Sequence, residues 1–124
     1  MSVQDQLKTL IERHCAALGG HVEEIGGKLS EFVRSETDHA ARLDDLVALT
    51  HKLNGSSGSI GFREVATVAA ALEEHLADLA FSPERPDPSD LARALQLFNA
   101  LERAVSQAKP EDSALYRADI ASST

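Results

Sequence analysis

The fold is indicated most clearly by residues 43–61, which read LDDLVALTHKLNGSSGSIG. Apolar or small side chains recur in this stretch every three or four positions, which is the spacing of an amphipathic α-helix. The positions that share this face are Leu43, Leu46, Thr50, Leu53, Ser57 and Ile60. The pattern predicts a helix over residues 38–60, capped by Ser35 with Asp38 or by Thr37, and ended or bent at Gly61.

The same period continues on both sides of this segment. Upstream, an apolar stripe runs from about Val3 to Val33 and keeps its phase across Gly19-Gly20 and Gly26-Gly27. These residues form either one long kinked helix or two helices divided at Gly19. Downstream, a third helix is predicted from Phe62, followed by a proline-rich loop over 82–89. Its expected core residues are Val65, Val68, Ala69, Leu72, Leu76 and Leu79.

A last helix, capped by Asp87 or Ser89, is predicted to stop before Pro110. Its expected core positions are Leu91, Leu95, Phe98, Leu101, Glu102 and Val105. The sequence therefore predicts an all-α protein, an up-and-down four-helix bundle with an additional or extended N-terminal helix. We expect residues 1–109 to form the bundle and residues 110–124 to be a loosely ordered tail, because that end lacks apolar periodicity.

The length of the first segment raises a packing problem. A single helix over residues 3–34 would be about 48 Å long, against about 35 Å for residues 38–60. The apolar side chains of the excess would lie beyond the bundle, and a stripe of that size is seldom left in water. We favour a break at Gly19-Gly20 that folds the first helix back and leaves a monomer. A homodimer that pairs through the overhanging helix is the alternative.

Composition excludes several classes of function. The chain has 124 residues, with 12 basic against 20 acidic side chains and a net charge of −8. Nucleic acid and anionic membranes would repel that charge, so neither is expected as a partner. We find no signal peptide and no apolar run long enough to span a membrane, which predicts a cytoplasmic protein. No GxxxxGK[ST] loop and no GxGxxG fingerprint for nucleotides is present.

His51 is the residue that the helix pattern marks out. It lies about 130° around the predicted helix from the centre of the core positions, and it therefore faces outward. Gly55 and Gly58 each cost the helix about 1 kcal/mol relative to alanine, which favours a role other than stability. The neighbours of His51 on this surface are Asp44, Val47, Ala48, Asn54, Gly55 and Gly58. The imidazole thus stands on a nearly bare patch that a bulky partner can reach.

Two kinds of chemistry are open to such a histidine. A metal site would need further ligands, and the patch offers only Asp44, so we predict no metal. The Glu36-x-x-His39 pair lacks the second copy that a di-iron bundle needs. The other histidines, His14, His21, His39 and His75, are interpreted as surface residues. A neutral, exposed imidazole is instead suited to nucleophilic attack on a phosphoryl group.

This segment resembles the signature of histidine-containing phosphotransfer (HPt) domains of bacterial multistep phosphorelays, HxLKGxSxxxG. His51, Leu53, Gly55, Ser57 and Gly61 match it, and Asn54 stands where the pattern has lysine. Leu72-Glu73 also stands where such domains often have Leu-Glu. The resemblance implies that His51 accepts a phosphoryl group from a receiver-domain aspartate and passes it to another receiver domain, without ATP binding or autophosphorylation.

The resemblance also implies partners and supporting residues. The expected partners are response-regulator receiver domains and a hybrid histidine kinase, with no cofactor of the chain's own and Mg²⁺ supplied by the receiver domain. Asn54, Ser57 and Lys52 are the candidates to support the phosphate, with Ser57 doing so if its hydroxyl turns outward. The docking patch would comprise Asp44, Val47, Ala48, Gly55 and Gly58. The alternative is a non-catalytic helical adaptor that binds a response regulator or another partner through the same face.

Overall fold

Four long α-helices run alternately up and down along one axis in the computed structural model, which describes residues 2–116. They are α1 (Val3–Arg34), α2 (His39–Ile60), α3 (Arg63–Phe81) and α4 (Pro88–Gln107), and a short 3₁₀ helix, η1 (Pro110–Asp112), follows. No strand occurs among the described residues. The predicted all-α four-helix bundle with an extended N-terminal helix is therefore confirmed. None of these helices is both long and apolar enough to cross a membrane.

Helix α1 is continuous over 32 residues, so the favoured break at Gly19-Gly20 is wrong. Its buried residues keep one phase on both sides of the glycines, as Ile11, Leu18 and Val22 illustrate. Burying Ile11 and Leu18 contributes about 1.5–3 kcal/mol each, against about 1 kcal/mol for each interior glycine. Long-range burial thus outweighs the local preference of Gly19-Gly20 for a helix end.

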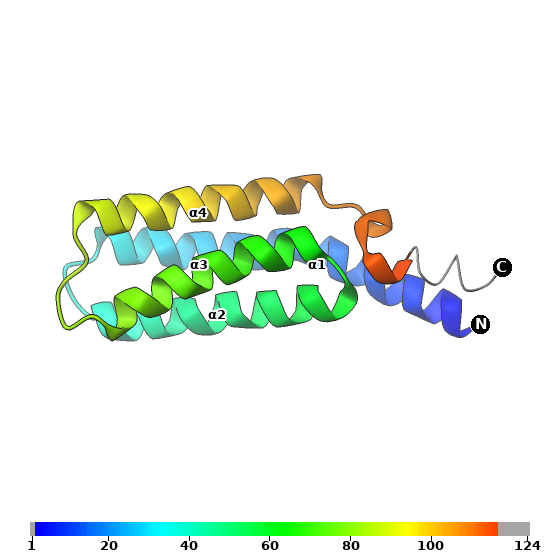
Figure 1. Ribbon diagram of the computed structural model, residues 1–124, viewed down its shortest axis with the longest axis horizontal. Coiled ribbons are helices and arrows are strands. Elements are labelled where there is room, and N and C mark those ends of the chain that lie inside the picture. The colour runs from blue at the N-terminus through cyan, green and yellow to red at the C-terminus, as the bar shows by residue number, and fades with distance from the viewer. Residues whose placement is uncertain (1, 117–124) are drawn as a thin grey trace.

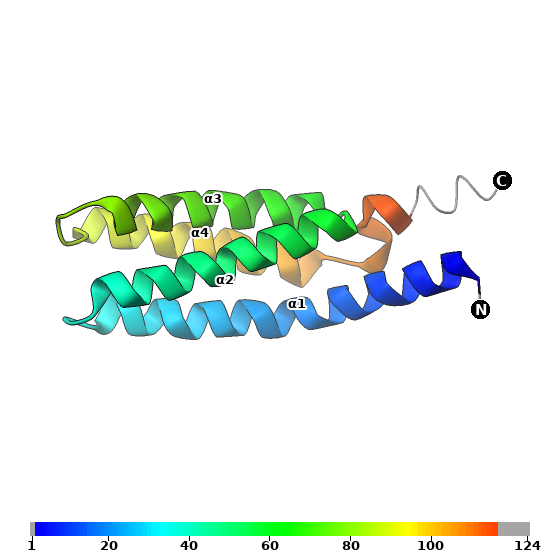
Figure 2. The same cartoon turned by 90° about the horizontal axis from the view of Figure 1, so that it is seen from below.

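The N-terminal end of α1 projects beyond the other three helices (Figures 1 and 2). Its inner side is covered by residues 108–116, which we call the C-terminal strap. The Cys15 thiol donates to the Ala108 carbonyl oxygen at 3.5 Å, and the Lys8 ammonium lies 5.4 Å from the centre of the Tyr116 ring. Ile11, on the same helix, is fully buried. The inner side of the overhang is therefore covered by the strap and not by a fold-back of α1.

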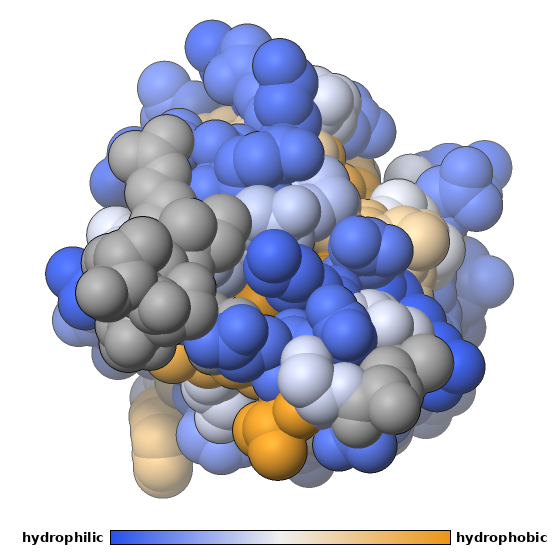
Figure 3. Space-filling model, turned by 90° about the vertical axis from the view of Figure 1, so that its right-hand side faces the viewer, coloured by the Kyte–Doolittle hydropathy of each residue, from blue (hydrophilic) through white to orange (hydrophobic). Residues whose placement is uncertain are grey.

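The strap is also fastened to the turn between α2 and α3. The Ser113 hydroxyl donates to the Ile60 carbonyl oxygen, and the Ala114 N–H donates to the Gly61 carbonyl oxygen at 3.0 Å. Residues 110–116 of the predicted tail are thus packed on the bundle, while residues 117–124 lie outside the described part of the chain. The coloured surface at this end is mostly hydrophilic, with a small hydrophobic group near its lower edge (Figure 3).

The helix ends follow the sequence at Gly61 and Asp87 but not at the start of α2. Gly61 ends α2 with a left-handed φ of 93°, and Asp87 forms a capping box with Asp90 at the start of α4. At the start of α2, however, the cap position is Asp38, whose side chain makes no capping bond. The Ser35 hydroxyl instead accepts from the Thr37 N–H at 3.2 Å, which closes the turn before the helix.

Helix α4 is rotated from its predicted orientation. Its buried residues are Ala94, Leu101 and Ala104, whereas Leu95 is 39% exposed and Glu102 lies on the surface. Helices α4 and α1 approach closely at Phe98, because a Cβ atom on Gly26 would lie 2.7 Å from its ring. Of the predicted core residues, Leu91, Phe98 and Val105 are half-buried against the core, whereas the predicted core roles of Leu95 and Glu102 are wrong.

Candidate functional site around His51

The imidazole of His51 stands on the outer surface of α2, with 73% of its side chain exposed. The buried residues of α2 (Leu43, Leu46, Thr50, Leu53 and Ser57) define the opposite side of the helix. These are the positions that the helical period predicts, so the outward placement of His51 is confirmed. Gly61 ends α2, and the antiparallel α3 begins two residues later, at Arg63.

Glu73 on α3 holds the imidazole in one orientation. The His51 Nδ1 and Glu73 Oε2 atoms are 2.8 Å apart. An ionised carboxylate only accepts hydrogen bonds, so Nδ1 is the protonated nitrogen of the ring. In a neutral imidazole the lone pair then belongs to Nε2. The arrangement leaves an oriented nucleophile on an exposed surface.

Asn54 completes this cluster. Its side-chain Nδ2 donates to Glu73 Oε1 at 3.4 Å, so the two carboxylate oxygens of Glu73 accept from Asn54 and His51 respectively. Sequence reasoning noted Glu73 only as half of the Leu72-Glu73 pair and gave it no role. The signal lies in the hairpin, because His51 precedes Gly61 by ten positions and Glu73 follows it by twelve. A tight turn at Gly61 places two positions at such similar distances from it side by side on the antiparallel helices α2 and α3.

The surface around His51 is built from small residues on two helices. A side chain on Gly55 would meet nothing within 4 Å, and a Cβ on Gly58 would lie 3.9 Å from Ala66 of α3. Ala66, Ala70 and Ala77 share the side of α3 that carries Glu73, by helical spacing. We call this surface the His51 face. It comprises Asp44, Val47, Ala48, His51, Gly55 and Gly58 of α2 with Ala66, Ala70, Glu73 and Ala77 of α3.

The other two candidates for supporting a phosphate lie elsewhere. Ser57 is fully buried, and its hydroxyl lies 3.2 Å from His14 Nε2 of α1, so it does not turn outward. Lys52 is exposed on the α1 side of α2, where it lines a small cavity with His21 and Glu24. Of the three predicted residues, Asn54 alone lies within the His51–Glu73 cluster.

His14 is half-buried rather than a surface residue. Its ring stacks on Phe62, with the ring centres 5.5 Å apart, and its Nε2 faces Ser57. Burial lowers the pKa of His14 below its usual value, and the nearby charge of His21 lowers it further. The contact joins the N-terminal half of α1 to α2, the helix that bears His51.

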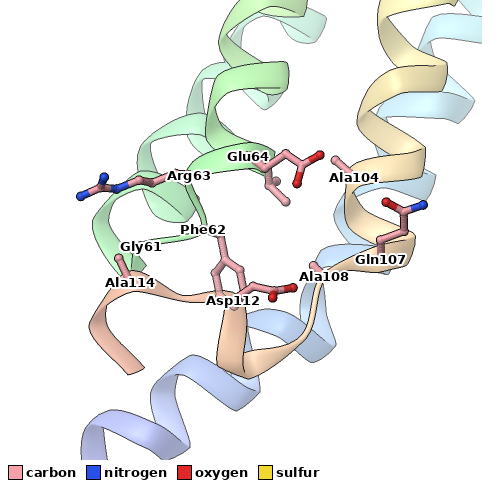
Figure 4. Close-up of a pocket in the computed structure, with 10 residues that line it drawn as sticks. Gly61, Phe62, Arg63, Glu64, Ala104, Gln107, Ala108, Asp112 and Ala114 are labelled. Carbon is pink, nitrogen blue, oxygen red and sulfur yellow. The ribbon is translucent and has the colours of Figure 1, made fainter. Parts of the chain in front are cut away.

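A cavity of about 480 Å³ lies where the strap meets the start of α3 and the end of α4 (Figure 4). Phe62, Asp112 and Gln107 are among its lining residues. It shares no residue with the His51 face, so it is a separate feature of the fold. Within residues 2–116, no group of three or more histidine, cysteine, aspartate or glutamate side chains is arranged to hold a metal ion.

Comparison with known proteins identifies one family. The family model described as "Hpt domain" matches residues 3–110, which include all four helices, the His51 face and the start of the strap. No curated protein and no solved structure matches the chain.

Proposed function

Because this chain belongs to the Hpt domain family, whose domains perform histidine phosphotransfer in phosphorelays with receiver domains and kinases, we propose that His51 is its phosphoryl acceptor. The donor is an aspartyl phosphate of a receiver domain, and a second receiver domain takes the group from His51. The observation that carries this assignment is the 2.8 Å contact between His51 Nδ1 and Glu73 Oε2, combined with the exposure of the ring.

The geometry supports an in-line transfer. The Nε2 lone pair attacks phosphorus, the N–P bond forms, and the bond between phosphorus and the aspartate oxygen breaks, which releases the aspartate carboxylate. Nδ1 keeps its proton throughout, so the ring becomes positively charged. The Glu73 carboxylate offsets that charge through the hydrogen bond at Nδ1. Transfer to the next receiver domain reverses these steps.

The surroundings of His51 suit a partner that brings most of the charge stabilisation. The small residues of the His51 face leave the ring open to a docked domain, and no lysine or arginine among residues 2–116 is hydrogen-bonded to the His51–Glu73–Asn54 cluster. Phosphoryl transfer depends mainly on positioning and charge stabilisation, which the donor's own site provides when it docks. The Mg²⁺ that the resemblance implies would belong to the receiver domain.

A non-catalytic adaptor is the competing function. It would use the same small residues for docking, but it would need neither an ordered Nδ1 proton nor an open Nε2 atom. The His51–Glu73 hydrogen bond therefore favours phosphotransfer over simple binding.

Phosphotransfer from labelled receiver domains tests the proposal. We expect the unmodified protein to take up phosphate from at least one phosphorylated receiver domain of the source organism, as an acid-labile, alkali-stable adduct. His51→Gln should take up none, and Glu73→Gln should react at least about tenfold more slowly, since the neutral amide offsets less charge. The exposed Glu102→Gln on α4 is the matched control. Phosphate uptake by His51→Gln would show that the assignment is wrong, and ATP alone should label nothing.

A further inference from the structure

The largest exposed apolar side chain of the described residues stands at the end of α3. Phe81 is the last residue of that helix and is 89% exposed, although a phenylalanine is usually buried. Phe81 is not part of the buried core. The residues that α3 contributes to the core are Val65, Ala69, Leu72, Leu76 and Leu79. The Phe81 side chain is therefore available for contact with another molecule.

Helical geometry places Phe81 beside the His51 face. It follows Glu73 by eight residues, which is about 80° around α3 and about 12 Å along its axis. The core residues Leu72 and Leu76 lie on the other side of Glu73, so Phe81 projects outward. A standard docking surface of about 800 Å² per partner has a radius of roughly 16 Å. Phe81 thus falls within the reach of any domain that is centred on His51.

The same end of the surface carries acidic side chains. Asp44 on α2 precedes His51 by seven residues and lies about 10 Å from it, in the direction of Phe81. Asp78 is one helical turn before Phe81, and both aspartates are exposed. Two arginines also lie near this end: Arg42 is paired with Glu31 of α1, and Arg85, in the loop that follows Phe81, donates to the Glu36 carbonyl oxygen. On the helix surface itself, Asp44 and Asp78 provide two exposed carboxylates near Phe81.

On the basis of the proposed function, we infer that Phe81, flanked by Asp44 and Asp78, is a specificity contact for receiver domains. It selects those that present an apolar side chain with lysine or arginine next to it, at the rim of the surface that surrounds their phosphorylated aspartate. Aromatic anchors commonly dominate the binding energy of an interface. Complementary charges around such an anchor steer the encounter and reject partners of the same sign.

Phosphotransfer kinetics with Phe81→Ala test the anchor. The probes are purified receiver domains of the source organism, loaded with acetyl phosphate, and the rate is measured against the concentration of this protein. For the receiver domain that the unmodified protein prefers, we expect Phe81→Ala to raise KM about tenfold while kcat stays unchanged. Val3→Ala is the matched control, because Val3 is also an exposed apolar residue, at 79%, and lies on the overhang. It should leave KM unchanged.

The charge contribution is tested separately. Asp44→Asn with Asp78→Asn should slow association with that receiver domain and flatten its dependence on salt, whereas Asp5→Asn with Glu12→Gln on the overhang should do neither. If Phe81→Ala and Val3→Ala have equal KM values for every receiver domain that phosphorylates His51, the specificity contact is wrong and the proposed function stands. If no receiver domain phosphorylates the unmodified protein, the proposed function is wrong and the specificity contact falls with it.

Discussion

At the scale of single residues, the charge balance around His51 would set how long a phosphoryl group remains there in the proposed phosphotransfer. Glu73 is the charged partner of the ring, and Asn54 donates to the same carboxylate where HPt domains commonly have a lysine. A phosphoryl group on Nε2 would add two negative charges near the negative charge of the Glu73 carboxylate. The site thus offers little electrostatic stabilisation of its own for the phosphorylated state.

Asn54→Lys should lengthen the life of the phosphohistidine. A cation one helical turn from His51 attracts the phosphoryl dianion, and an extra 1.4 kcal/mol corresponds to about tenfold in rate. We therefore expect phosphate loss to slow by several-fold to about tenfold, measured as release of phosphate from the purified phosphorylated protein. Ser59→Lys, on the same helix but away from the ring, should have little effect. Faster loss from Asn54→Lys would contradict this electrostatic account.

His14 should make the fold sensitive to mild acid. Because burial and His21 lower the pKa of His14 in the folded state, protons bind its unfolded form more strongly. Its stabilising effect is complete above the unfolded pKa of about 6.5 and is lost as pH falls below it. Between about pH 7.5 and 5.5, we expect Tm to fall more in the unmodified protein than in His14→Gln, whose amide can still bond to Ser57. Parallel Tm curves for the two proteins would exclude this role.

At the scale of elements, Gly61 is the residue on which the α2–α3 hairpin depends. Its φ of 93° disfavours any side chain, and a Cβ atom there would lie 2.9 Å from the Ala114 nitrogen of the strap. Gly55, in contrast, is an ordinary helical position with open space around it. The two motif glycines therefore serve different purposes, one structural and one an uncovered surface beside His51.

Alanine substitutions should change the free energy of unfolding in opposite directions at Gly61 and Gly55. Gly61→Ala should lower the free energy of unfolding by at least about 1–2 kcal/mol, because a left-handed conformation and a close contact both oppose the new methyl group. Gly55→Ala should raise it by up to about 1 kcal/mol through helix propensity. Urea unfolding measures both values. Similar values for the two variants would show that the hairpin does not require a glycine at position 61.

The elements also show how far the sequence alone can predict this structure. The core face of α2 and the exposure of His51 follow from the helical period, because both depend on one helix. The continuity of α1 and the rotation of α4 depend on contacts between distant segments, such as Phe98 with Gly26. Ser57 lies on the core face as predicted, but its inward contact could not be predicted from one helix, since its partner His14 lies 43 positions away. Glu73 could have been placed from the hairpin spacing.

At the scale of the whole molecule, the strap takes the place of the fold-back that the sequence predicts for the overhang. It passes from the end of α4 across α1 to the α2–α3 turn, and it buries Ser113 fully. Within the strap, η1 contacts α1 at the end of the bundle where α1 begins. The first half of α1 therefore depends on the strap for its inner cover.

Deletion of residues 110–124 should destabilise the protein and promote self-association. Without the strap, Ile11 and Phe62 lose part of their cover, and exposed apolar stripes favour pairing with another chain. We expect a lower Tm and a mass above the 13.3 kDa monomer in sedimentation at high concentration. Ser113→Ala, which removes one hydrogen bond, should cost only about 1 kcal/mol and leave the mass unchanged. A truncated protein that keeps the Tm of the full chain and sediments as a monomer would show that the strap is dispensable.

The glycines within α1 imply that this helix does not open as one unit. Gly19 and Gly20 lie in its middle, and neither would place a Cβ atom within 4 Å of another part of the protein. Such positions offer the backbone amides little shielding, and they separate a half that packs along the bundle from a half that the strap covers. In native-state hydrogen exchange, the amides of the N-terminal half should therefore exchange through a partial opening, well below the global unfolding free energy. The amides of the C-terminal half, which adjoins α2, should exchange only when the whole bundle unfolds.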